Sequence, residues 1–189
     1  SAYGRDSRMD FWIFVALVFG PLIVLQFAMQ IVLAFPSMDV LAANARGDAE
    51  ASRAMFESQM KGMVSAAYAS IGIFLIGALL LLSATARRLH DRGRAGWWAL
   101  ILPLGLFATG LGQARRTAEA VERMPALMEK IERQPGDPAS MIDWMAHANA
   151  SAHGPDWPAI VGGLLLVWLV IELARAGTDG PNRFGPVPE

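Results

Sequence analysis

The residues best suited to chemistry lie in one basic stretch, 86–98, which reads ARRLHDRGRAGWW. His90 and Asp91 are of the types used in general acid–base catalysis. Adjacent residues on a helix do not face each other, so these two are not expected to act as a catalytic pair. Arginines near an anionic membrane surface contribute about 1 kcal/mol each. We therefore expect the stretch to contact lipid headgroups through its four arginines, Arg87, Arg88, Arg92 and Arg94.

Polar residues inside long apolar runs form a second group of candidates. Gln26 and Gln30 lie one helical turn apart, so they would either hydrogen-bond to a neighbouring helix or line a polar cavity. Glu172 is an acidic residue near the end of the last apolar run, and such a residue is a functional candidate by default. Arg175 follows at i+3, which favours an ion pair over a proton relay.

Few other residues suggest a catalytic or cofactor site. His147 and His153, with Asp143 and Asp156, match no metal-ligand spacing and lie on both sides of a Gly-Pro break. The chain has no cysteine, no phosphate-binding loop and no nucleophile motif. Its formal net charge of −1 gives no signature of nucleic-acid binding. We expect no metal, no cofactor, no nucleic-acid partner and no enzymatic activity.

The elements that must position these residues are membrane helices. Hydrophobic residues make up 54% of the 189-residue chain, and the charges fall into a few segments. About 20 apolar residues cross a bilayer core of roughly 30 Å. The sequence therefore predicts a single all-α membrane domain over 1–189 with four transmembrane helices, at about 11–35, 63–86, 95–114 and 158–175.

The third run leaves an alternative open. Pro103 and Gly105 interrupt it, although membrane helices tolerate both residues when neighbours satisfy the freed backbone groups. Arg115 and Arg116 follow at once and would lie on the non-cytoplasmic side. A re-entrant hairpin over 97–112, with three spans elsewhere, would keep this pair cytoplasmic.

Two polar segments, 37–62 and 115–157, read as inserted amphipathic helices. Gly47-Asp48 predicts a break and a helix cap in the first segment, whose helix should run straight into the second span. In the second segment, Pro125 should kink or divide the helix, and Gly136-Asp137-Pro138 should restart it. Their apolar stripes must be buried, so we expect these segments to pack on a protein partner or on each other.

The distribution of charge and tryptophan predicts the orientation. Arginines close to spans stay cytoplasmic, and tryptophan prefers the headgroup layer. With both termini cytoplasmic, half of the 16 basic residues lie inside, so the absolute count is a tie. The density of arginine in 86–98 favours this orientation, with three tryptophans as interfacial anchors: Trp12, Trp97 and Trp98.

Three motifs occur in order along the chain: GRDSRMDFW at 4–12, RRLHDRGRAGWW at 87–98 and GTDGPNRFGP at 177–186. Together they resemble the bacterial inner-membrane family called domain of unknown function 805. The resemblance implies a helical protein of the inner (plasma) membrane, and it implies no activity. The resemblance also implies that short members of the family share the membrane core of this chain and lack its two inserted segments.

The carboxyl-terminal motif at 177–186 (the tail) and the basic stretch at 86–98 (the turn) would lie on the same membrane face in this topology. We expect Arg87, Arg88 and Arg183 to tie them together structurally, with Asn182 as part of the tail motif. The turn is too short to fold alone, and the glycines and prolines of the tail cannot continue a helix. The acidic partners expected for the arginines are Asp91, Glu172 and Asp179.

Two classes of function fit these features. The first is a non-catalytic accessory, assembly or scaffold subunit that binds a partner through its inserted segments. The alternative is a small transporter or channel lined by Gln26, Gln30 and Glu172. We rank it lower because the spans hold one carboxylate and show no inverted repeat.

Orientation can be tested with single cysteines, because the natural chain has none. Ser52→Cys and Ser140→Cys are both expected to react with a membrane-impermeant maleimide in intact cells. Labelling at position 52 alone would support the re-entrant hairpin. Labelling at neither position, with both accessible in lysed cells, would show that the orientation is the reverse of the predicted one.

Overall fold

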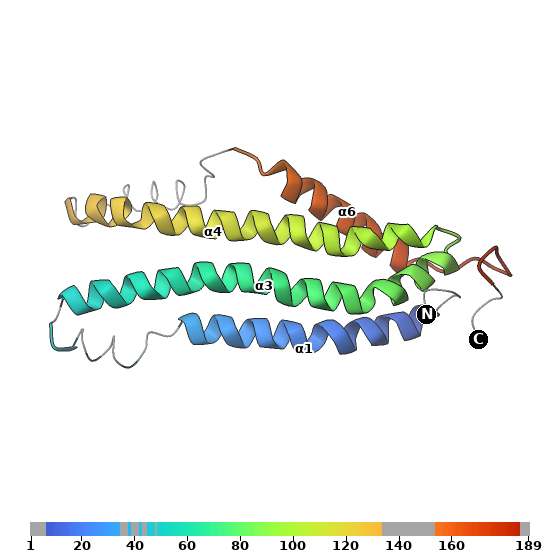
Figure 1. The fold of residues 1–189 in the computed structure, drawn as a ribbon, viewed down its shortest axis with the longest axis horizontal. Helices are drawn as coiled ribbons and strands as arrows, with labels where there is room; N and C mark the ends of the chain where they lie inside the picture. The colour runs from blue at the N-terminus through green and yellow to red at the C-terminus, as the bar shows by residue number, and fades with distance from the viewer. Residues whose placement is uncertain are drawn as a thin grey trace.

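The computed structural model describes residues 7–34, 38, 42, 45–47, 49–133 and 154–185. Within them the chain is helical, and the only β pairing is one isolated bridge between Asn182 and Gly185. Four helices are long and apolar enough to cross a membrane, which confirms the predicted fold class. They alternate in direction and form an elongated bundle (Figure 1). The helices are α1 (Arg8–Ala34), α3 (Ala49–Asp91), α4 (Ile101–Arg133) and α6 (Trp157–Ala174), with a short 3-10 helix η1 (Gly96–Leu100) before α4.

Two of the helices are far longer than a bilayer requires. α3 has 43 residues and α4 has 33, so they measure about 65 Å and about 50 Å at 1.5 Å per residue. Gly47 has a positive φ of 72°, and α3 begins two residues later, which agrees with the predicted break. α3 then continues into the second span without interruption, as expected.

The third span is one continuous helix, so the re-entrant hairpin is wrong. η1 leads directly into α4, which runs to Arg133 without reversing. Pro103 lies in the first turn of α4, where the missing N–H has no intrahelical acceptor. Pro125 was expected to kink or divide the helix, but the helix is not divided there. The predicted restart at Gly136-Asp137-Pro138 lies outside the described residues.

A tight turn joins α3 to η1. Gly93 adopts a left-handed φ of 70° and donates its N–H to the His90 carbonyl at 2.9 Å. The next N–H, of Arg94, reaches the Leu89 carbonyl at 2.8 Å. These two bonds form a Schellman motif, which satisfies carbonyls that a helix end leaves unpaired. Glycine takes the left-handed conformation without a side-chain clash.

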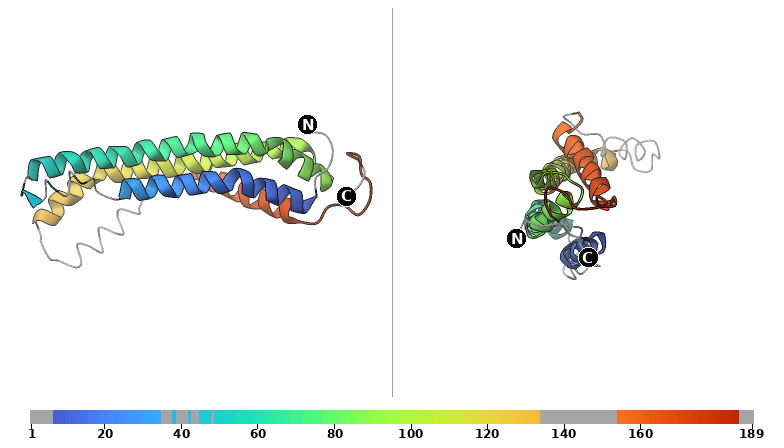
Figure 2. Two further views of the ribbon diagram at one scale, coloured as in Figure 1. Left: turned by 90° about the horizontal axis from the view of Figure 1, so that it is seen from below. Right: turned by 90° about the vertical axis from the view of Figure 1, so that its right-hand side faces the viewer.

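The packing order follows the chain. α1 lies on α3, α3 on α4, and α4 on α6, which crosses α4 at an angle (Figures 1 and 2). The largest cluster of buried hydrophobic residues surrounds the turn, at the end where α1 begins and α6 ends. Many apolar side chains elsewhere on the spans are exposed, as expected where lipid replaces water. The cluster consists of Phe11, Ala84, Ala86, Leu89, Ala99, Ile101, Leu169 and Leu173.

Two glycines set the crossing of α4 and α6. A Cβ added at Gly105 would lie 2.6 Å from Leu166 Cγ and 3.1 Å from the Gly162 carbonyl oxygen. A Cβ at Gly162 would lie 2.9 Å from the Ala108 Cβ. Small residues let membrane helices approach closely, because packing and not hydrophobicity drives their association. Gly105 therefore permits this contact and is more than an interruption in an apolar run.

The crossing can be tested with two neighbouring glycines. Gly162→Ala should lower the melting temperature in detergent, because overpacking costs about 1–3 kcal/mol. Gly163→Ala is the matched control, since a Cβ there would meet only Thr109 Cγ2 at 3.7 Å. Both changes favour helix formation equally, so they differ only in the contact. Equal melting temperatures for the two variants would contradict the close approach.

Candidate functional site: the arginine turn and the carboxyl tail

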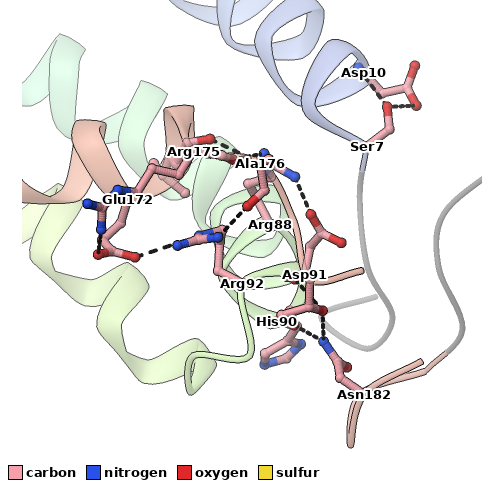
Figure 3. Close-up of polar contacts among 12 residues, drawn as sticks. Ser7, Asp10, Arg88, His90, Asp91, Arg92, Glu172, Arg175, Ala176 and Asn182 are labelled. Atoms are coloured by element: carbon pink, nitrogen blue, oxygen red, sulfur yellow. Dashed lines mark hydrogen bonds and ion pairs between the residues drawn. The ribbon is translucent and has the colours of Figure 1, made fainter. Parts of the chain in front are cut away.

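Arg88 is the buried centre of this site, with 1% of its surface exposed. Its Nε donates to the Leu173 carbonyl at 3.1 Å, and one terminal nitrogen donates to the Arg175 carbonyl. The other terminal nitrogen pairs with Asp91, almost one turn along α3 (Figure 3). The last carbonyls of a helix have no intrahelical partner. One arginine side chain of α3 therefore caps the end of α6.

The tail that follows α6 caps the end of α3 in return. The Thr178 N–H and hydroxyl both donate to the Asp91 carbonyl, at 3.0 Å and 3.1 Å. The Asn182 side-chain amide donates to the His90 carbonyl at 2.9 Å (Figure 3). Each of the two helix ends thus supplies donors for the other. We call this arrangement the reciprocal cap.

Two further features hold the tail against α3. Arg92 donates to the Ala176 carbonyl, just beyond the end of α6. At the next residue, Gly177, an added Cβ would overlap the Asp91 carboxylate. The backbone of the tail therefore passes too close to α3 for any side chain at this position.

Glu172 is buried beside the reciprocal cap, with 3% of its surface exposed. Its carboxylate lies 3.3 Å from Arg175, 3.5 Å from Arg94 and 3.8 Å from Arg92, measured between nitrogen and oxygen atoms (Figure 3). A buried charge is costly unless it is paired. The three guanidinium groups pair with Glu172 from two separate chain segments, while its Oε2 atom has no hydrogen-bond partner within the described chain.

A cluster of arginines lies beside the negative groups at this end of the bundle. α3 and α6 both end here, and each helix C-terminus carries about half a negative charge. Two carboxylates add to it, those of Asp91 and Glu172. The opposing positive charges are four arginines: Arg88, Arg92, Arg94 and Arg175.

Residues 182–185 of the tail fold into a tight turn over His90. Asn182 and Gly185 exchange two backbone hydrogen bonds of 3.1 Å and 3.0 Å. This turn stacks the Phe184 ring on His90, with ring centres 4.0 Å apart and planes 9° apart. Arg183 is exposed and lies over Phe184 at 4.6 Å from the ring centre. This contact of Arg183 is therefore within the tail, and the tail donors that reach the turn are Thr178 and Asn182.

The remaining candidates of the turn lie apart from one another. The His90 ring faces Phe184, while the Asp91 carboxylate faces Arg88. Neighbouring positions on α3 thus carry the two side chains to different partners. Arg87 is half-buried on α3, and Asp179 is exposed in the tail.

The amino end of the chain joins the same region. The Ser7 hydroxyl accepts from the Asp10 N–H at 3.2 Å and donates to the Asp10 carboxylate at 2.6 Å, which caps α1 (Figure 3). Phe11, next to the expected interfacial anchor Trp12, is 2% exposed and packs in the cluster around Leu89. A buried ring at this position secures the start of α1 to the turn.

Tryptophans surround this end of the bundle. Trp97 is 60% exposed and stacks on Trp98, with ring centres 4.0 Å apart. Trp98 in turn contacts Trp168 of α6 at 5.2 Å. Trp12 and Trp98 are half-buried against the hydrophobic cluster, so they pack the protein as well as facing its surroundings.

The intramembrane polar residues do not form one site. Gln26 and Gln30 line a groove between α1, α3 and α4, together with Gln113 and Arg116. Glu172 belongs to the arginine cluster and is not among the residues of the groove. Sequence alone could not separate them, because it does not show which helices are neighbours.

The described residues hold no group of three or more His, Asp or Glu side chains placed to bind a metal ion. Asp156 instead caps α6 by accepting the Ala159 N–H at 3.1 Å. The other members of the sequence cluster, Asp143, His147 and His153, lie outside the described residues.

Comparison with known proteins now identifies the family. The family of proteins of unknown function termed DUF805 matches residues 1–186. The chain belongs to this family. The matched range includes both inserted segments as well as the three motifs, and the family is one of unknown function. No curated protein and no solved structure gave a match.

The stability of the reciprocal cap can be measured directly. Arg88→Ala should lower the free energy of unfolding by about 3–5 kcal/mol, because it leaves the buried Asp91 without its partner. Arg88→Lys should cost nearly as much, since lysine cannot supply a planar fork of donors. Truncation after Ala176 should also destabilise the protein, because it removes Thr178 and Asn182.

Thermal unfolding in detergent gives the measurement, and Arg115→Ala is the control at an exposed arginine of α4. The control should melt like the parent. If Arg88→Ala, Arg88→Lys and the truncated chain also melt like the parent, the cap is not a structural element.

Proposed function

We propose that this DUF805 member is a non-catalytic accessory, assembly or scaffold subunit of a membrane complex. The observation that carries the proposal is the length of α3 and α4 beyond a bilayer of roughly 30 Å. Both helices extend past the C-terminal end of α1, on the side opposite the arginine turn (Figure 1). We call residues 49–62 of α3 and 115–133 of α4 the paired arm.

The surface of the paired arm suits contact with protein. Its exposed residues include Arg53, Glu57, Glu122 and Glu129, so charges of both signs face outward. The apolar residues Met55 and Phe56 are half-buried, so their stripe is only partly covered by the described chain. A polar rim around an apolar centre is the usual composition of a protein–protein interface.

The opposite end of the bundle suits contact with anionic lipid headgroups. The side chains of Arg94 and Arg175 are 49% and 59% exposed although both pair with Glu172. Arg183 is exposed as well. We assign this end to the cytoplasmic face of a bacterial inner membrane, with both termini cytoplasmic, because basic residues close to spans are retained there.

A transporter or channel finds less support. That function would need Glu172 to share a path with Gln26 and Gln30. The glutamines line a groove on α1, α3 and α4, whereas Glu172 pairs with arginines at the end of α6. α1 also packs on α3, whereas α6 packs mainly on α4.

The partner hypothesis can be tested by photo-crosslinking in cells. A photoreactive amino acid at Glu57 or Glu122, one on each helix of the arm, should give a discrete adduct with another protein. The matched control is Leu79, a 60% exposed residue within the span of α3, which should give none. Mass spectrometry would identify the adduct. If both arm positions give no adduct, and the protein purifies alone from mild detergent, the accessory role is wrong.

A further inference from the structure

The groove between α1, α3 and α4 is a second site, at the other end of the spans from the arginine turn. It has a volume of about 1000 Å³, at the upper end of the range for small-molecule sites. α3 forms its floor, and α1 and α4 form its walls. α1 packs mainly on α3, so a space remains between α1 and α4.

The depth of the groove places it across a membrane boundary. Trp12 and Trp98 pack against the same hydrophobic cluster and mark one level of the bundle. Gln30 lies 18 residues beyond Trp12, and Arg116 lies 18 residues beyond Trp98. Either interval is about 27 Å along a helix, close to the thickness of the bilayer core. Gln30 and Arg116 therefore lie together near the opposite boundary.

The lining changes in character with depth. From the boundary near Gln30 and Arg116 towards the centre of the bilayer, Phe74 and Leu106 give the groove an apolar inner end. At the boundary, the lining carries hydrogen-bonding groups from Gln30, Gln113 and Thr117. Deeper on α1, the buried side-chain oxygen of Gln26 has no hydrogen-bond partner within the described chain.

The described lining of the groove carries positive charge and no negative charge. Arg116 is its one ionisable residue among those described, and the lining holds no carboxylate. A guanidinium group surrounded by amide and hydroxyl groups is suited to a phosphate oxygen. The apolar inner end is suited to hydrocarbon. We propose that the groove binds one anionic phospholipid, with its phosphate at Arg116 and an acyl chain along Phe74 and Leu106.

The test uses the full-length protein purified in a nonionic detergent. Phosphatidylglycerol and phosphatidylcholine with the same dioleoyl chains are titrated separately, and native mass spectrometry counts the lipids retained per chain. One phosphatidylglycerol should remain per chain, with phosphatidylcholine bound more weakly. Arg116→Gln should weaken retention of phosphatidylglycerol about fivefold, as expected for one basic residue at an anionic surface.

Arg115→Gln is the matched control, because Arg115 is the adjacent exposed arginine and does not line the groove. It should retain the lipid like the parent. Equal effects of Arg115→Gln and Arg116→Gln, including no effect of either, would overturn the proposal. So would equal retention of the two phospholipids.

Two more measurements address the acyl chain. Ala67→Phe should fill the floor of the groove and reduce retention while Arg116 stays in place. Excess glycerol 3-phosphate should fail to displace phosphatidylglycerol, because it offers the phosphate without the hydrocarbon. Displacement by this soluble anion would indicate that the groove binds a free phosphate compound, and it would overturn the proposal of a bound phospholipid.

Discussion

Unpaired backbone carbonyls at helix ends constrain this fold more than any other feature. A buried acceptor without a donor costs about 1–3 kcal/mol, and a membrane offers no water to replace it. The reciprocal cap meets this demand for α3 and α6 with the same few residues. Arg88 donates to the end of α6, while Thr178 and Asn182 donate to the end of α3. At the end of α3 the turn itself supplies donors for Leu89 and His90, whereas the Asp91 carbonyl takes its donors from the tail.

Stability is therefore distributed unevenly along the bundle. The turn end has the largest hydrophobic cluster, the reciprocal cap and the arginine cluster around Glu172. Towards the paired arm, α1 and α4 separate and leave the groove. The described parts of the three sequence motifs fall at the packed end, and the described parts of the inserted segments, 49–62 and 115–133, lie at the open end. Such a division suits a protein with a fixed frame at one membrane face and adaptable surfaces at the other.

Sequence reasoning recovered the parts of this structure that depend on local chemistry. Charge-free runs of about 20 residues predict spans, and the arginine-rich stretch 86–98 lies between two of them. The continuous helix over 49–91 was also predictable, because residues 50–61 hold neither proline nor glycine and an isolated glycine, here Gly62, is tolerated in a helix. These features require no knowledge of which helices are neighbours.

The features that sequence reasoning missed depend on the path of the chain in space. Sequence does not show that Phe11, beside the expected anchor Trp12, packs in the same buried cluster as Leu89. Arg183 looked like the residue that ties tail to turn. Asn182 reaches the turn instead, because the tight turn of the tail directs its amide to the His90 carbonyl. Two potential donors one position apart can be distinguished only once the backbone direction is known.

The continuity of α3 also has a mechanical consequence. It is a single rod of about 65 Å that is clamped at the arginine turn and reaches the tip of the paired arm. A rod held at one end acts as a lever, so a tilt of about 5° at the clamp displaces the far tip by roughly 6 Å. A small change of contacts at the arginine turn would thus become a larger movement at the far tip of the paired arm.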